Sequence, residues 1–106
     1  MVGQTEQALT AAGQNYEVGV AKFSELAKGQ MLGGHEGFLK ILFDPSSLEI
    51  LGVHAIGEGA TEIIHIGQTG MHMNCTLCYF RDAVFNYPTL AEAYRVAALN
   101  GLGRIS

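Results

Sequence analysis

Two apolar segments joined by a turn sequence constrain the fold of this chain more than any other feature. Residues 38–43 and 49–56 are rich in Leu, Ile, Phe and Val, and residues 44–47 read Asp-Pro-Ser-Ser. Proline has the fixed φ angle that suits a turn, and Asp and Ser favour the positions around it. Two strand-like segments on either side of a short turn predict an antiparallel β-hairpin. Successive side chains of each strand would lie on alternate faces of the sheet.

Helical periodicity follows the hairpin. Over residues 60–73, apolar residues recur at spacings of three and four, which is typical of one face of an α-helix. Residues 75–82 predict a second, short helix, and residues 89–99 predict a third helix that ends at Asn100-Gly101. Because this third segment is apolar on most of its surface, we expect it to be buried on several sides.

The N-terminal part of the chain adds further elements and defines the fold class. Residues 5–12 predict a short helix that Thr5 caps and Gly13 ends. Residues 16–23 predict a strand, and residues 24–28 predict a helical turn or a loop. Strands followed by helices indicate an α+β fold, with an antiparallel sheet that carries helices on one face. At 106 residues the chain has the length of one domain.

Charge and apolar content restrict the kinds of partner that this chain can bind. The formal net charge is −4 and the six Lys and Arg residues are scattered, so we expect no nucleic acid partner. No apolar run is long enough to span a bilayer, so we expect no membrane partner. Hydrophobic residues make up 48% of the chain, which is high for a small domain. A face that packs on a second copy would explain this excess, and we therefore expect a homodimer.

Cys75 and Cys78 form a Cys-x-x-Cys sequence. Such a pair can act in thiol–disulfide exchange, but the βαβ pattern of thioredoxin-like proteins does not surround it. Together with His72 the pair offers three zinc ligands, whereas a structural zinc site has four. We expect no metal site here, and a stand-alone interaction module with a redox or metal site at Cys75 and Cys78 is kept as an alternative. Residues 1–7 lack a signal-peptide pattern, so we expect a reducing, cytoplasmic location.

Residues 57–62 follow a predicted strand and open a predicted helix, as a dinucleotide-binding loop would. The third glycine of that fingerprint is replaced by Glu62, and Glu58 and Glu62 would repel a pyrophosphate. We therefore expect no cofactor to bind to this chain alone.

Residues 85–95 carry the most distinctive local motif. Thr89 and Glu92 fit a capping box, in which each side chain bonds to the backbone N–H of the other at a helix start. Pro88 precedes the predicted helix and favours an extended Tyr87. A phenol has an ordinary pKa of about 10, against about 6.5 for imidazole. Tyr87 is therefore a poor base at neutral pH.

The same segment resembles the C-terminal signature of the flavin-dependent pyridine nucleotide-disulfide oxidoreductases. Disulfide-reducing members of that family have a His where this chain has Tyr87, and the Glu that orients this His matches Glu92. The resemblance implies that Thr89 and Glu92 are structural residues at a subunit interface and that no residue of this chain is catalytic. It also implies that the backbone of Tyr87 and Pro88 meets the flavin of the partner subunit.

Most of the chain takes part in the resemblance. Residues 5–8, 16–19, 38–43 and 49–54 resemble the interface domain of the family, and residues 62–68 and 91–102 resemble its soluble transhydrogenases. Residues 1–106 would then be a C-terminal dimerisation domain without its usual first strand and without the flavin and nicotinamide domains of the parent enzyme.

The resemblance also implies a reaction. The parent would carry FAD and transfer hydride between NADPH and NAD, and this chain would complete the flavin site of the partner subunit. The isolated 106-residue chain is expected to be inactive. The alternative within the family is the dimerisation domain of a lipoamide dehydrogenase-like disulfide reductase.

Overall fold

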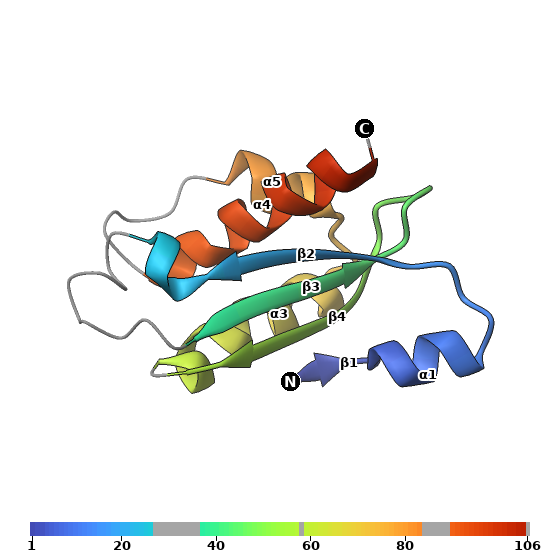
Figure 1. The fold of residues 1–106 in the computed structure, drawn as a ribbon, viewed down its shortest axis with the longest axis horizontal. Coiled ribbons are helices and arrows are strands. Elements are labelled where there is room, and N and C mark those ends of the chain that lie inside the picture. Colours follow the sequence, from blue (N-terminus) through green and yellow to red (C-terminus); the bar gives the residue numbers. More distant parts are fainter. Residues whose placement is uncertain (27–36, 58, 84–89, 106) are drawn as a thin grey trace.

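The computed structural model describes residues 1–26, 37–57, 59–83 and 90–105. In chain order these residues form β1 (Val2–Gly3), α1 (Glu6–Ala11), β2 (Glu17–Lys22), the 3-10 turn η1 (Phe23–Glu25), β3 (Phe38–Phe43), β4 (Ile50–Ile56), α3 (Ala60–His72), α4 (Leu77–Asp82), the 3-10 turn η2 (Leu90–Glu92) and α5 (Ala93–Ile105) (Figure 1). The helices and strands predicted within these ranges are present, and only α5 ends far from its predicted position.

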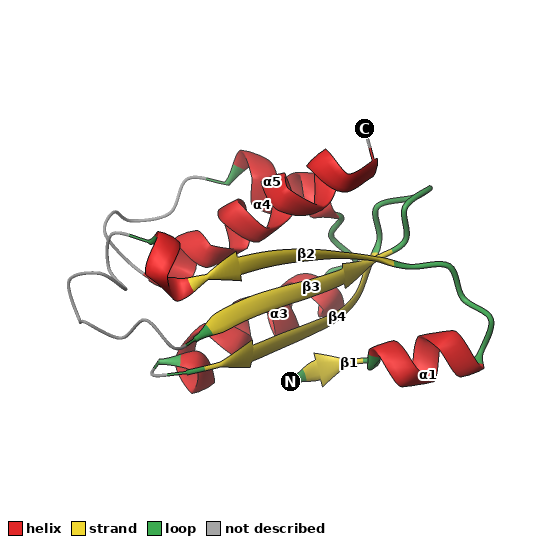
Figure 2. Cartoon of the chain, in the orientation of Figure 1, coloured by secondary structure: helices red, strands yellow, loops and turns green. Residues whose placement is uncertain are grey.

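The four strands form one antiparallel sheet in the order β1-β4-β3-β2 (Figure 2). β3 and β4 form the predicted hairpin. At its turn, Asp44 Oδ1 accepts hydrogen bonds from the backbone N–H groups of Ser46 and Ser47, at 2.8 and 3.2 Å. These bonds hold the pKa of the Asp44 carboxyl below its ordinary value. The predicted turn chemistry therefore closes the hairpin as expected.

α3, α4 and α5 gather on one face of the sheet, and α3 passes behind β3 and β4 in the view of Figure 1. Several strand residues on this face are fully buried, among them Ala21, Leu39, Ile41 and Val53. The same core contains Phe80, Tyr94, Ala97 and Ala98 from the helices. The α+β fold with an antiparallel sheet and helices on one face is thus confirmed.

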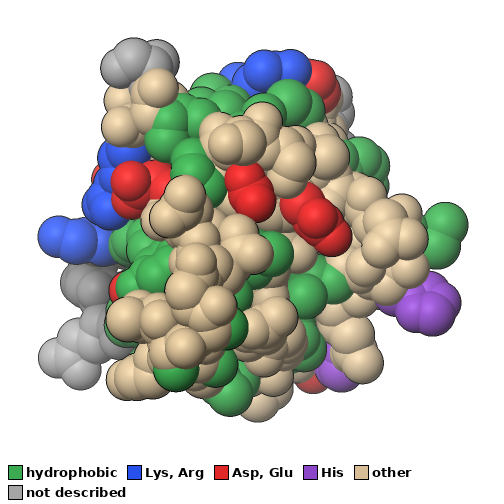
Figure 3. Space-filling model, turned by 90° about the vertical axis from the view of Figure 1, so that its right-hand side faces the viewer, with side chains coloured by type: hydrophobic (Ala, Val, Ile, Leu, Met, Phe, Trp, Pro, Cys, Tyr) green, Lys and Arg blue, Asp and Glu red, His purple; other side chains and the backbone are tan. Residues whose placement is uncertain are grey.

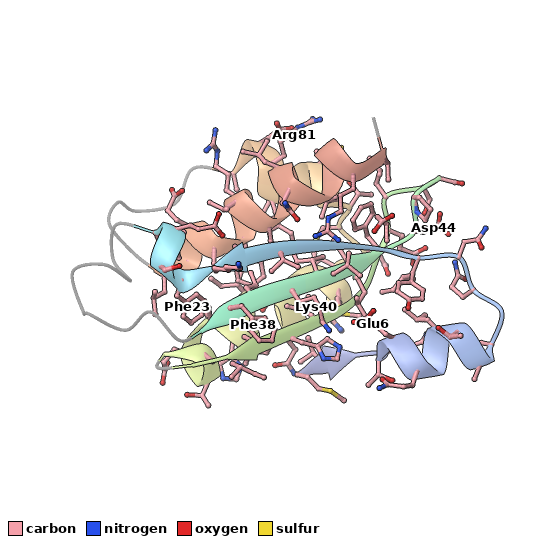
Figure 4. The ribbon with its side chains drawn as sticks, in the orientation of Figure 1. Glu6, Phe23, Phe38, Lys40, Asp44 and Arg81 are labelled. Carbon is pink, nitrogen blue, oxygen red and sulfur yellow. The ribbon has the colours of Figure 1, made fainter. Side chains whose placement is uncertain are left out.

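The short helix α1 lies against the opposite face of the sheet, which the sequence did not predict. Lys40 lies between Leu39 and Ile41 in β3, so its side chain points away from α3 and α5. Its Nζ donates to Glu6 Oε2 in α1 at 2.6 Å, and the two side chains meet in Figure 4. The predicted cap of α1 is present, because Thr5 Oγ1 accepts a hydrogen bond from the backbone N–H of Ala8 at 3.1 Å. α1 therefore covers part of the second face.

The predicted end of the last helix at Asn100-Gly101 is wrong, because α5 continues to Ile105. Gly101 is buried inside this helix, and a Cβ there would lie 2.7 Å from Phe43 Cε1. On the facing strand, a Cβ at Gly19 would lie 2.2 Å from the carbonyl oxygen of Ala97. Gly101 therefore allows α5 to approach the sheet closely, and it does not end the helix.

Candidate functional site

Residues 85–89 of the predicted signature lie outside the described residues, whereas residues 90–95 are described. Tyr87, Pro88 and Thr89 lie outside the described residues, so the flavin contact and the capping box both stay predictions. Glu92 is described: it is the last residue of η2 and is partly buried. The described part of the signature is therefore η2 and the start of α5, which pack on the other helices.

The start of the last helix packs on the start of α3. Gly59, the N-cap of α3, has a φ angle of +83°, a left-handed value that favours glycine. A Cβ at Gly59 would lie 2.6 Å from Leu90 Cδ1 in η2. The absence of a side chain at Gly59 thus leaves room for Leu90, and it brings the signature next to α3.

One turn further along, Tyr94 joins α5 to α3 by two hydrogen bonds. Its hydroxyl donates to the backbone carbonyl of Ile63 at 2.5 Å and accepts from the backbone N–H of Gly67 at 2.8 Å. The phenol ring also contacts Phe80 of α4, with ring centroids 4.8 Å apart. Burial raises the pKa of Tyr94 to about 12. Tyr94 is therefore a buried neutral phenol that connects three helices.

Tyr94 is not among the site residues predicted from the sequence. The sequence does indicate such a contact, because Tyr94 lies in the most apolar predicted helix and a buried hydroxyl requires a hydrogen-bond partner. Gly67 on the facing helix α3 also indicates a close contact. A Cβ at Gly67 would lie 2.9 Å from Val53 Cγ1 and 3.0 Å from the Tyr94 hydroxyl oxygen. The glycine allows α3 to approach both the sheet and Tyr94.

An apolar groove lies on the outer side of α3 and α4. Its volume is about 640 Å³, and it is lined by His65, Ile66, Thr69, Gly70, Met73, Cys75 and Tyr79. Met73 and Tyr79 are 71% and 56% exposed, although both are large and mostly apolar. Exposed apolar side chains grouped around a groove are typical of a surface that binds a partner.

Cys75 and Cys78 are both free and partly buried. Burial raises the pKa of the Cys75 thiol, which lowers the fraction of reactive thiolate at neutral pH. His72 is exposed, and within the described residues no group of three or more His, Cys, Asp or Glu side chains could hold a metal ion. These observations favour the structural reading of both cysteines over the redox alternative.

The connection from β4 to α3 does not fit a dinucleotide. β4 belongs to an antiparallel sheet, whereas a dinucleotide-binding loop follows a strand of a parallel βαβ unit. Glu62 lies exposed in the first turn of α3, where its charge would repel a pyrophosphate. The described residues of this connection therefore do not match a dinucleotide-binding loop.

The described surface mixes charged and apolar groups. At the end of the molecule seen in Figure 3, acidic side chains lie among apolar and neutral ones. Basic residues pair with acidic ones, as Arg81 does with Asp82 at 2.8 Å and Arg104 with Glu17 at 3.9 Å. None of the helices in the described part of the chain is long and apolar enough to cross a membrane. The expectations about nucleic acid and membranes stay predictions.

The fold and the exposed groove define a small domain suited to association. Residues 1–98 match the family described as the dimerisation domain of pyridine nucleotide-disulphide oxidoreductases. The chain belongs to this family, as the resemblance implied.

Similar proteins include soluble pyridine nucleotide transhydrogenases. Those of Serratia proteamaculans (strain 568) and Escherichia coli O139:H28 are each 57% identical over 107 residues, a match that covers 98% of this chain. The chain spans 23% of the length of these relatives. It is thus similar to one segment of a much longer protein.

Solved structures show the same fold at lower identity. LpdA from Mycobacterium tuberculosis has a TM-score of 0.85 at 20% identity, over 92% of this chain and 21% of that one. The HOCl-induced flavoprotein disulfide reductase RclA from Escherichia coli has a TM-score of 0.86 at 21% identity, over 92% and 22% of the two chains. At such identity these structures establish the fold alone.

Proposed function

We propose that this chain is the dimerisation domain of a cytoplasmic, FAD-dependent enzyme that transfers hydride between NADPH and NAD. The observation that carries the proposal is the 57% identity with soluble pyridine nucleotide transhydrogenases across 98% of the chain. The flavoprotein disulfide reductase RclA, which has the same fold, is only 21% identical. The identity therefore favours the transhydrogenase branch over the lipoamide dehydrogenase-like alternative.

Tyr87 supports the same branch by its chemistry. A disulfide reductase needs a group that exchanges a proton with a thiol, and a phenol with a pKa of about 10 does this poorly at neutral pH. Hydride transfer between two nicotinamide nucleotides produces no thiol, so it needs no such group. A tyrosine at this position is thus compatible with hydride transfer and unfavourable for disulfide reduction.

FAD, NAD and NADP are the cofactors and substrates that the proposal assigns to the whole enzyme. The flavin would supply the hydride chemistry, and the flavin and nicotinamide domains of the whole enzyme would bind the nucleotides. The contribution proposed for this chain is association, together with the backbone of Tyr87 and Pro88 placed against the flavin of the partner subunit. Thr89 and Glu92 would shape the start of the helix that follows.

The proposed association is a homodimer, and the apolar groove beside α3 and α4 is the surface that supports it best. Met73 and Tyr79 are the large exposed apolar side chains at this groove. Burying them against a second copy would remove apolar area from water at about 25 cal/mol per Å². The packing of Leu90 on Gly59 and of Tyr94 on Gly67 would connect this surface to the start of the last helix.

A chimeric enzyme tests the proposal. The matching segment of the transhydrogenase from Serratia proteamaculans is replaced by this chain, and the product is assayed by sedimentation and by reduction of an NAD analogue with NADPH. We expect a flavin-loaded dimer with transhydrogenase activity within about tenfold of the unmodified host, since the chemical groups of the host are unchanged. The host enzyme without this segment is the control.

Two outcomes would count against the proposal. A chimera that folds and stays monomeric would contradict the dimerisation role. A dimeric, flavin-loaded chimera that reduces lipoamide but does not transfer hydride between nicotinamide nucleotides would contradict the assigned branch.

A further inference from the structure

β2 forms an edge of the described sheet. The strand order β1-β4-β3-β2 gives it β3 as its one neighbour within the described residues. An edge strand carries a row of outward N–H and C=O groups, and such a row can pair with a strand of another chain. β2 has the sequence Glu-Val-Gly-Val-Ala-Lys, and the side chains of Val18 and Val20 are partly exposed. An uncovered strand of this kind is prone to association.

Side-chain oxygens cap the N–H groups of β2 at every second residue. The N–H of Val18 donates to Glu17 Oε1 at 3.0 Å, and the N–H of Val20 donates to Asn100 Oδ1 at 3.0 Å. The N–H of Lys22 donates to Glu25 Oε1 at 2.7 Å. In an antiparallel pair, alternate residues point their N–H groups away from the neighbouring strand. The three caps therefore lie along one edge.

The three caps come from different parts of the chain. Glu17 belongs to β2 itself, and Glu25 belongs to η1, directly after the strand. Asn100 belongs to α5 and lies 80 residues away from Val20 in the sequence. It reaches the central position of the edge only because α5 crosses β2 at Gly19 and Gly101. Local turn chemistry does not account for a cap of this kind.

We propose that Glu17, Glu25 and Asn100 close the β2 edge against pairing with a strand of a second copy of this chain. A strand that approached this edge would have to displace three side-chain hydrogen bonds, and it would meet two carboxylates. Closure of the edge would restrict association of the domain to its other surfaces, so that a dimer does not grow into a continuous sheet. The proposal holds whether the unmodified chain is a monomer or a dimer.

The test compares two triple variants of the 106-residue chain. The edge variant is Glu17→Ala/Glu25→Ala/Asn100→Ala. The control variant, Glu49→Ala/Glu62→Ala/Gln68→Ala, removes the same two charges and one amide from exposed positions away from this edge. Sedimentation velocity over a range of concentrations gives the size distribution, and amide hydrogen exchange by NMR reports on Val18, Val20 and Lys22.

We expect the edge variant to form concentration-dependent species larger than those of the unmodified chain. At the lowest concentration its Val18, Val20 and Lys22 amides should exchange at least tenfold faster. The control variant should match the unmodified chain in both measurements. An edge variant with an unchanged size distribution would overturn the proposal.

If the triple edge variant does not fold, the single variant Asn100→Ala tests the proposal. Asn100 is exposed on α5, and Ala is the better helix former there. Faster exchange at Val20, together with larger species at high concentration, would support the proposal. Asn100→Asp, which replaces the amide oxygen by a carboxylate oxygen as acceptor, should behave as the unmodified chain does. Unchanged behaviour of Asn100→Ala would overturn the proposed role of this residue.

Discussion

The hydroxyl of Tyr94 in α5 accepts a hydrogen bond from the backbone N–H of Gly67 in α3, and it donates one to the carbonyl of Ile63 one turn earlier. These two backbone groups are four residues apart, the spacing at which they would bond to each other in a regular helix. The phenol of Tyr94 thus binds α3 through two backbone groups that pair with each other in a regular helix. Several properties of the protein should depend on this contact.

Removal of the hydroxyl in Tyr94→Phe should lower the free energy of unfolding by about 1 to 2 kcal/mol. Two buried backbone groups lose a partner, although Ile63 and Gly67 can still bond to each other within the helix. Urea denaturation followed by circular dichroism measures the change. Tyr79→Phe, at a tyrosine that is 56% exposed, is the matched control and should have little effect. Equal stability of the two variants would show that the buried hydroxyl contributes nothing.

Alkaline pH should destabilise the protein between about pH 10 and 12. Burial raises the pKa of Tyr94 from 10.0 to about 12, so the unfolded chain releases this proton more readily than the folded one. The stability that the neutral phenol contributes is complete below pH 10 and is lost as the pH rises toward 12. Unfolding measured at several alkaline pH values should show this loss, and Tyr94→Phe should show less of it.

Two glycines of α5 should respond to alanine in opposite directions. Gly101→Ala places a Cβ 2.7 Å from Phe43 Cε1, so we expect a loss of about 1 to 3 kcal/mol from overpacking. Gly103→Ala meets nothing within 4 Å and should stabilise the helix by up to about 1 kcal/mol. Thermal or urea unfolding of both variants measures these changes in the free energy of unfolding. Similar effects at the two positions would refute the proposed close approach of α5 to the sheet.

Acid should weaken the contact between α1 and β3. The hydrogen bond from Lys40 is the main cause that holds the pKa of the Glu6 carboxyl below its ordinary value of 4.5. The stability from this pair is present above pH 4.5 and is lost as the pH falls through the lowered pKa. Lys40→Met should raise the pKa of Glu6, which NMR titration of its carboxyl carbon can follow. Lys22→Met should leave this pKa unchanged, and an effect of similar size there would indicate a general charge effect.

Introducing a histidine at the signature should not create a disulfide reductase. In the chimeric transhydrogenase described above, Tyr87→His supplies an imidazole with a pKa of about 6.5. The proposed reaction forms no thiol that such a group would protonate, so lipoamide reduction should stay at background. Strong lipoamide turnover by this variant, measured through NADH consumption, would contradict the assignment to the hydride-transfer branch.

Local chemistry allowed much of the fold to be predicted from the sequence. The hairpin follows from its turn residues, where Asp44 accepts from the two residues after Pro45. The start of α1 follows from Thr5 and the N–H of Ala8. Both arrangements join groups within a few residues of each other, so the sequence pattern contains what is needed. The last helix extends past its predicted end because Gly101, a residue type that often ends a helix, here packs against the sheet inside α5.

The candidate site was harder to predict because its contacts join distant segments. Leu90 meets Gly59, and Tyr94 meets Gly67 across 27 residues. Neither contact follows from the spacing of residues within a helix. The sequence did point to the region, since Tyr94 lies within the signature, residues 85–95.

The sequence by itself determined the α+β class, the hairpin, the order of the helices and the family of the protein. These depend on local turns, on periodicity and on motifs that can be read along the chain. Only the tertiary structure decided that Gly101 lies at a helix–sheet contact and that Tyr94 bonds to α3. It alone brought Asn100 to the N–H of Val20, 80 residues away. The physical reason is that close packing decides which distant groups meet, and a glycine or an asparagine has the same local chemistry with or without such a neighbour.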